Sequence, residues 1–151
     1  MALAQNTFYD THPRPVTLTN AHLVEDAAQI WLNSLVGIDA TSGLAIPYDG
    51  GLTAFMGLAT HERLGTSGVY GAGDSRGEIV IDVSGPQIKV PVTAAASAAD
   101  NGLPVWATDD GTFTKTDPTG SLPVGYIRNW LSGTTCWVQL LSAQEFFAQT
   151  T

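Results

Sequence analysis

The stretch that decides the fold lies in the middle of the chain and reads Glu78-Ile79-Val80-Ile81-Asp82-Val83-Ser84-Gly85-Pro86-Gln87-Ile88-Lys89-Val90-Pro91-Val92. Apolar and polar side chains alternate over residues 78–83, and they alternate again with the opposite phase over residues 87–92. Alternation of this kind, rich in β-branched residues, is typical of strands with one buried face. Because Ser84, Gly85 and Pro86 are turn residues, we predict two strands paired as a hairpin.

Similar runs, bounded by turn residues, recur on both sides of this stretch. They cover residues 29–38, 44–47, 53–59, 104–108, 112–115, 124–130 and 136–141. The alanines after Thr93 predict one short helix over about residues 93–100, which Asn101-Gly102 ends. Short strands at this spacing predict a mainly β fold, a small barrel or sandwich of antiparallel strands. The alternation predicts one shared core for Val80 or Val83, Val90, Val105, Phe113 and Ile127.

Residues 21–36 leave two alternatives open. Glu25, Asp26 and Ala27 favour a helix, whereas the alternation that begins near Ile30 favours a strand over residues 29–38. The pattern within this segment does not separate the two, and we expect the strand.

The N-terminus differs in composition from the rest of the chain. Pro13 and Pro15 flank Arg14, and each proline fixes its own φ angle and removes a backbone donor. We expect residues 1–20 to form an extended arm, with Phe8 and Tyr9 available for contacts, and residues 21–151 to form a single β domain. A disordered terminus is the alternative.

Composition excludes several classes of function. The chain has 151 residues, of which 44% are hydrophobic and 13% charged, with a formal net charge of −8. So acidic a chain lacks the Lys and Arg density that direct nucleic-acid binding requires. No apolar run approaches the roughly 20 residues that span a bilayer, so we expect a soluble protein without a membrane partner. We see no secretory signal, and the single Cys136 cannot form an intrachain disulfide.

Nothing in the sequence predicts catalysis, a cofactor or a bound metal. His12, His22 and His61 have no metal-ligand spacing, and Cys136 lies in a strand-like run where a buried, inert thiol is expected. Asp49 and the Asp109-Asp110 pair stand next to glycines, which is first a turn signature. They lack the alternating ligands and distal Glu of a calcium loop, and no G-x-S-x-G nucleophile motif occurs. We therefore expect a protein that is not an enzyme.

The second half of the chain carries a recurring set of structural motifs. A strand, a small turn and a strand ending in Val90-Pro91 fill residues 77–92, and residues 98–114 continue with Asp109-Asp110-Gly111 at a turn. The run Pro123-Val124-Gly125-Tyr126-Ile127 then matches a closing V-G-x-[VI] strand. In these motifs the chain resembles the capsid cement, or head decoration, proteins of tailed bacteriophages. The likeness extends over residues 29–141 and is clearest over residues 77–127.

This resemblance implies a structural virion protein that binds the outer surface of the capsid and stabilises it. The implied partner is the major capsid protein, and the implied location is the virion, with synthesis in the host cytoplasm. The implied assembly is a homo-oligomer, for which the resemblance favours a trimer and a dimer is the alternative. The residues expected to contact the capsid or a neighbouring subunit are those of the arm: Phe8, Tyr9, Pro13, Arg14 and Pro15. The alternative is a β-sandwich module that binds a ligand such as carbohydrate through exposed aromatics, namely Trp31, Trp106, Trp130 or Trp137.

Overall fold

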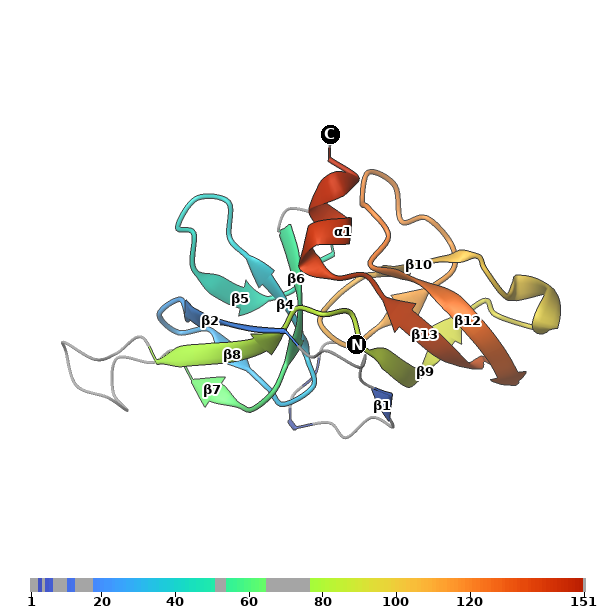
Figure 1. The fold of residues 1–151 in the computed structure, drawn as a ribbon, viewed down its shortest axis with the longest axis horizontal. Helices are drawn as coiled ribbons and strands as arrows, with labels where there is room; N and C mark the ends of the chain where they lie inside the picture. Colours follow the sequence, from blue (N-terminus) through green and yellow to red (C-terminus); the bar gives the residue numbers. More distant parts are fainter. Residues whose placement is uncertain are drawn as a thin grey trace.

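The computed structural model describes residues 3, 5, 6, 11, 12, 18–50, 54–64 and 77–150, and the fold is given for these residues. They form two small β structures side by side, and the short helix α1 (Ala143–Ala148) lies between them at one edge (Figure 1). The predicted mainly β class with a small barrel is confirmed. None of the helices in the described ranges is long and apolar enough to cross a membrane.

The first structure, here called the C-terminal barrel, is a closed ring of five strands. Around the ring these are β9 (Gln87–Thr93), β11 (Phe113–Thr114), β10 (Pro104–Ala107), β12 (Gly125–Ser132) and β13 (Thr135–Leu140). Pairing of β13 back onto β9 closes the ring, and β11 runs parallel to β9 while every other pair is antiparallel. Closure leaves no long free edge in the barrel.

The second structure, here called the N-terminal sheet, has five antiparallel strands. Their order is β2 (Thr19–Leu23), β8 (Glu78–Asp82), β6 (Ala54–Ala59), β4 (Leu35–Ile38) and β5 (Ala45–Pro47). Val24, directly after β2, bridges to Ala45 on β5, so the two edges of this sheet meet. The short pair β3 (Gln29–Ile30) and β7 (Arg63–Leu64) accompanies it.

Side chains along β4 and β6 point alternately to the two faces of the N-terminal sheet, and those on one face pack against the barrel. Leu35 and Phe55 pack in the same buried cluster as the barrel interior, whereas their neighbours Val36 and Met56 belong to a second cluster on the other face. The central strands β4 and β6 are therefore buried on both faces, and one of these faces shares its core with the barrel.

The expected shared core is largely confirmed. Val90, Val105, Phe113 and Ile127 are all buried within the barrel. Val83 is buried in the second cluster instead, because β8 belongs to the N-terminal sheet.

The predicted hairpin of residues 78–83 and 87–92 is wrong, although both strands exist. β8 pairs with β2 and β6, whereas β9 pairs with β13, β11 and β1 (Thr11–His12). The turn between them carries the chain from the sheet into the barrel. Gly85 has φ +76, and a Cβ there would lie 2.6 Å from the Leu140 carbonyl oxygen, so the turn packs directly on the end of β13.

The expected helix over residues 93–100 is also misplaced. Thr93 ends β9, and Ala94 has φ +70, which a right-handed helix does not allow. Only a single 3₁₀ turn follows, η1 (Ala98–Asp100), capped by Ser97. The longer helix is α1, where Ser142 and Glu145 form a capping box.

Near the N-terminus the extended alternative is correct, with one interruption. Residues 21–36 contain β2, β3 and the start of β4 and no helix, and Ala27 has φ +66. The strand expected over residues 29–38 is broken by a turn in which Asn33 has φ +62. β2 begins at Thr19, and so crosses the boundary expected between arm and domain.

Candidate functional site

The residues predicted to contact the capsid, namely Phe8, Tyr9, Pro13, Arg14 and Pro15, lie outside the described residues. Their described neighbours contact the domain. The Leu3 amide donates to Asp110 Oδ1 at 3.0 Å, and Asn6 Oδ1 accepts from the Leu32 amide at 2.8 Å. Strand β1 pairs with the start of β9. Parts of the arm therefore follow the surface of both β structures.

The four tryptophans do not form one binding surface. All are half-buried, and the indole N–H groups of Trp106 and Trp130 donate to the carbonyl oxygens of Ser121 and Gly133. Trp130 packs against the barrel core, whereas Trp106 and Trp137 alternate with buried neighbours and so face outward. Trp106 and Trp137 lie on opposite sides of β12, and extending the strand register offsets them by about five residues, or roughly 16 Å, along it. Trp31 belongs to the N-terminal sheet region.

The titratable groups discussed in the sequence analysis lie in turns, in the barrel interior or in hydrogen bonds to the backbone. Asp109 and Asp110 occupy the turn between β10 and β11, where the Gly111 amide donates to Asp109 Oδ1. Burial raises the pKa of Asp110, and burial also raises the pKa of the Cys136 thiol inside the barrel. The Nε2 atom of His61 accepts from the Val80 amide at 3.1 Å. Across the described ranges, no three His, Cys, Asp or Glu side chains gather closely enough to hold a metal ion.

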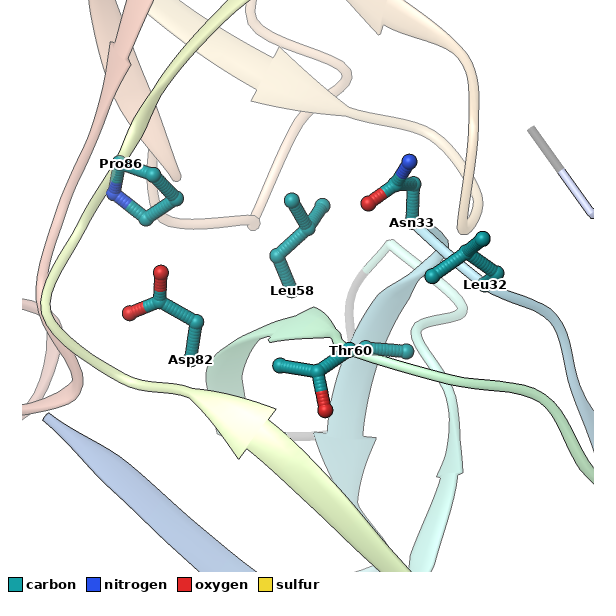
Figure 2. A pocket seen from close by; sticks show the side chains of 7 residues that line it. Leu32, Asn33, Leu58, Thr60, Asp82 and Pro86 are labelled. Atoms are coloured by element: carbon teal, nitrogen blue, oxygen red, sulfur yellow. The ribbon is translucent and has the colours of Figure 1, made fainter. Parts of the chain in front are cut away.

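A small pocket lies where the N-terminal sheet meets the turn into the barrel. Its volume is about 220 Å³, and it is lined by Leu32, Asn33, Leu58, Ala59, Thr60, Asp82 and Pro86. Figure 2 shows the Asp82 carboxylate and the Asn33 amide on opposite sides of the Leu58 side chain. The pocket is thus mostly apolar, with one carboxylate at one side.

The pocket is positioned by close pairing of β6 with β8. Leu58 and Asp82 are direct partners across these strands, and Gly57 lets the backbones approach. On the other side of the pocket, the backbone amide of Asn33 donates to the Ala59 carbonyl oxygen at 2.9 Å and fixes the turn after β3. Asn6 links this turn to Glu62 through its side-chain amide.

Asp82 is 9% exposed and is the charged residue that sequence analysis missed. In the alternation of residues 78–83 it occupies a polar position, which by itself does not indicate burial. Asp is uncommon within strands, and its spacing from Ser84 fits a local side-chain-to-backbone turn. These two signals mark Asp82 as unusual, but only the meeting of β6, β8 and the turn after β3 shows that it lines a pocket.

Comparison of the chain with protein-family models, curated proteins and solved structures finds no match.

Proposed function

We propose that this protein is a structural virion protein that binds the outer surface of a tailed-bacteriophage capsid and stabilises the shell. The observation that carries the proposal is the sequence resemblance over residues 77–127 to cement proteins. In the fold this stretch forms β8 to β11 and the start of β12, so it comprises most of the barrel and the strand that joins it to the N-terminal sheet. The motifs that resemble cement proteins are therefore scaffold elements, consistent with a role in binding and rigidity.

The shape of the protein suits a stiffening role. A closed barrel and a sheet whose central strands β4 and β6 are buried on both faces resist deformation because the interior is close-packed. Apolar side chains also remain on the outside: Tyr126 on β12 is 37% exposed and lies opposite Pro104 on β10, next to Leu103, which is 41% exposed. Such side chains provide contact area for a protein partner.

The arm is the proposed attachment element. Phe8 and Tyr9 offer large contact areas with few rotatable bonds, and Pro13 and Pro15 restrict the chain before it binds. Arg14 is one of only six basic residues in the chain and supplies a donor for a carboxylate of the shell. The arm would meet the major capsid protein or a neighbouring copy.

Sedimentation with purified heads tests the proposal. Heads of the phage that encodes this chain are prepared without it, and added protein should then sediment with them at saturable stoichiometry and raise their resistance to heat. The double variant Phe8→Ala/Tyr9→Ala should bind at least about tenfold more weakly, while the control Thr7→Ala should bind normally. Absence of the protein from purified virions, together with no binding to bare heads, would refute the function. Unchanged binding of the double variant would refute only the role of the arm.

We also propose that the bound protein is a homo-oligomer, with a trimer favoured by the resemblance and a dimer as the alternative. Few charges and several exposed apolar side chains favour self-association. Single copies resolved by electron microscopy on intact heads would contradict this.

The alternative, a carbohydrate-binding module, receives less support. Stacking on a sugar requires exposed aromatic rings within reach of one ligand. The outward-facing Trp106 and Trp137 are separated by strand β12 and are offset by roughly 16 Å along it. Saturable quenching of tryptophan fluorescence by an oligosaccharide would reverse this preference.

A further inference from the structure

The Asp82 side chain has an unusual, half-completed set of hydrogen bonds. Its Oδ1 atom accepts from the Ser84 amide at 2.9 Å and from the Ser84 hydroxyl at 2.5 Å. Its Oδ2 atom accepts from none of the described residues, yet it is not among the atoms sealed inside the protein. The turn into the barrel therefore satisfies the hydrogen-bonding capacity of Oδ1, whereas Oδ2 faces the pocket.

A carboxylate that is nine-tenths buried normally has a cation or several donors beside it. None of the residues that line this pocket is basic. The hydroxyl of Thr60 already donates to the Val80 carbonyl oxygen at 2.8 Å. The described part of the protein thus leaves Asp82 Oδ2 without a counter-charge, and a ligand that supplies one would be favoured.

We propose that this pocket binds the ammonium group of a lysine side chain presented by a partner protein. The ammonium would donate to Asp82 Oδ2, and the four-carbon stem would lie along Leu58 and Pro86, in the manner of a charged side chain that buries its apolar stem. A volume of about 220 Å³ is far more than one water molecule needs and accommodates this group. The net charge of −8 favours approach of a basic surface.

The geometry discriminates between cations. An arginine guanidinium binds best to two oxygens of one carboxylate, but Ser84 occupies Oδ1 twice. A lysine ammonium is a compact donor that needs only one oxygen. Calcium requires six to eight oxygen ligands, and the lining supplies one carboxylate. A free small amine would lose its translational freedom for a single charged contact, whereas a side chain on a docked protein shares that cost with the whole interface.

The proposal concerns the pocket alone, so it is tested on the purified protein without capsids. The probe is Nα-acetyl-lysine-N-methylamide, titrated into ¹⁵N-labelled protein while the amide signals of Asn33, Leu58 and Asp82 are followed. Because the isolated amide lacks the rest of the interface, we expect weak binding, with shifts at these residues that saturate at millimolar concentrations. The norleucine analogue has an apolar stem but no ammonium and should bind at least about tenfold more weakly, and the arginine analogue should also bind more weakly.

Two variants assign the binding to the carboxylate. Asp82→Asn keeps an oxygen for the Ser84 donors but loses the charge, and should weaken lysine-amide binding by about tenfold. Asp117→Asn removes a carboxylate from the loop after β11 and should leave binding unchanged. If Asp82→Asn does not fold, comparing the lysine and norleucine analogues on the unaltered protein still shows whether the ammonium group contributes to binding.

Four results would overturn the proposal. Equal affinity for the norleucine analogue would make the pocket a purely apolar site, and unchanged binding by a folded Asp82→Asn would remove the carboxylate from it. Binding of n-butylammonium without binding of the lysine amide would indicate a free amine as the ligand. Absence of saturable shifts with every probe would mean that the pocket holds only water.

Discussion

Gly57 on β6 is the residue on which the sheet beside the pocket most depends. Its φ is +152, and a Cβ at this position would lie 2.1 Å from the Asp82 carbonyl oxygen. Gly57→Ala therefore adds a backbone strain and a collision with β8, and we expect it to lower the free energy of unfolding by about 2–4 kcal/mol. Chemical denaturation measures the loss. Gly43→Ala is the matched control, because Gly43 has φ +70 in open space and should cost only about 1–2 kcal/mol. Equal losses would mean that β6 and β8 separate easily.

Ser34 and Ser84 are both buried but should respond in opposite ways to removal of the hydroxyl. The Ser34 Oγ atom has no hydrogen-bond partner among the described residues, whereas the Ser84 hydroxyl donates to Asp82 Oδ1. Ser34→Ala should be neutral or stabilising by up to about 1 kcal/mol, and Ser84→Ala should be destabilising by about 1.5–3 kcal/mol. Thermal and urea unfolding of the two variants compare them directly. A clear loss for Ser34→Ala would reveal a hydrogen bond through an internal water.

Among the elements, the turn η1 is held by Asp100, which is 6% exposed. Lys115 donates to its Oδ1 at 2.6 Å, and the amides of Ala96 and Ser97 donate to its Oδ2. The hydrogen bond from Lys115, followed by that from the Ala96 amide, lowers the pKa of Asp100 from 3.8 to about 2. A lowered folded-state pKa stabilises the protein above pH 3.8, and this contribution is lost as the pH falls toward 2. The difference in melting temperature between the unaltered protein and Asp100→Asn should therefore shrink between pH 4 and pH 2. A constant difference over this window would contradict the role of the ionised carboxylate.

The elements also show how far local sequence determines this fold. Strands β8, β9, β12 and β13 were predicted because alternation and turn residues are local signals. The partner of a strand is not a local property: Pro86 and Gly85 indicated a turn but not that it leads into another sheet, so the hairpin was wrong. The helix α1 had a local signal in Ser142 and Glu145 that was overlooked. The pocket forms because β6, β8 and the turn after β3 lie together in the fold, and no local sequence pattern predicts that tertiary contact.

The core shared by the barrel and the N-terminal sheet holds the two β structures together. Phe55 on β6 makes edge contacts with Tyr48 and with Phe146 of α1, at ring-centre distances of 5.8 and 5.6 Å. All three belong to the same buried cluster as the barrel residues Val105 and Phe113. Because removal of Phe55 would leave a cavity that borders both structures, Phe55→Ala should cost about 3–5 kcal/mol.

That shared cluster predicts one cooperative unfolding transition for both β structures. Amide signals of Ile79, in the sheet, and of Val105, in the barrel, should disappear at the same denaturant concentration and move together in Phe55→Ala. Phe113→Ala, deep in the barrel, should cost about the same amount and also move both midpoints. If the sheet instead unfolds first, and Phe55→Ala shifts only the Ile79 midpoint, the two structures are independent units. Two independent units would also count against the proposed role in stiffening a shell, because one rigid body suits that role better.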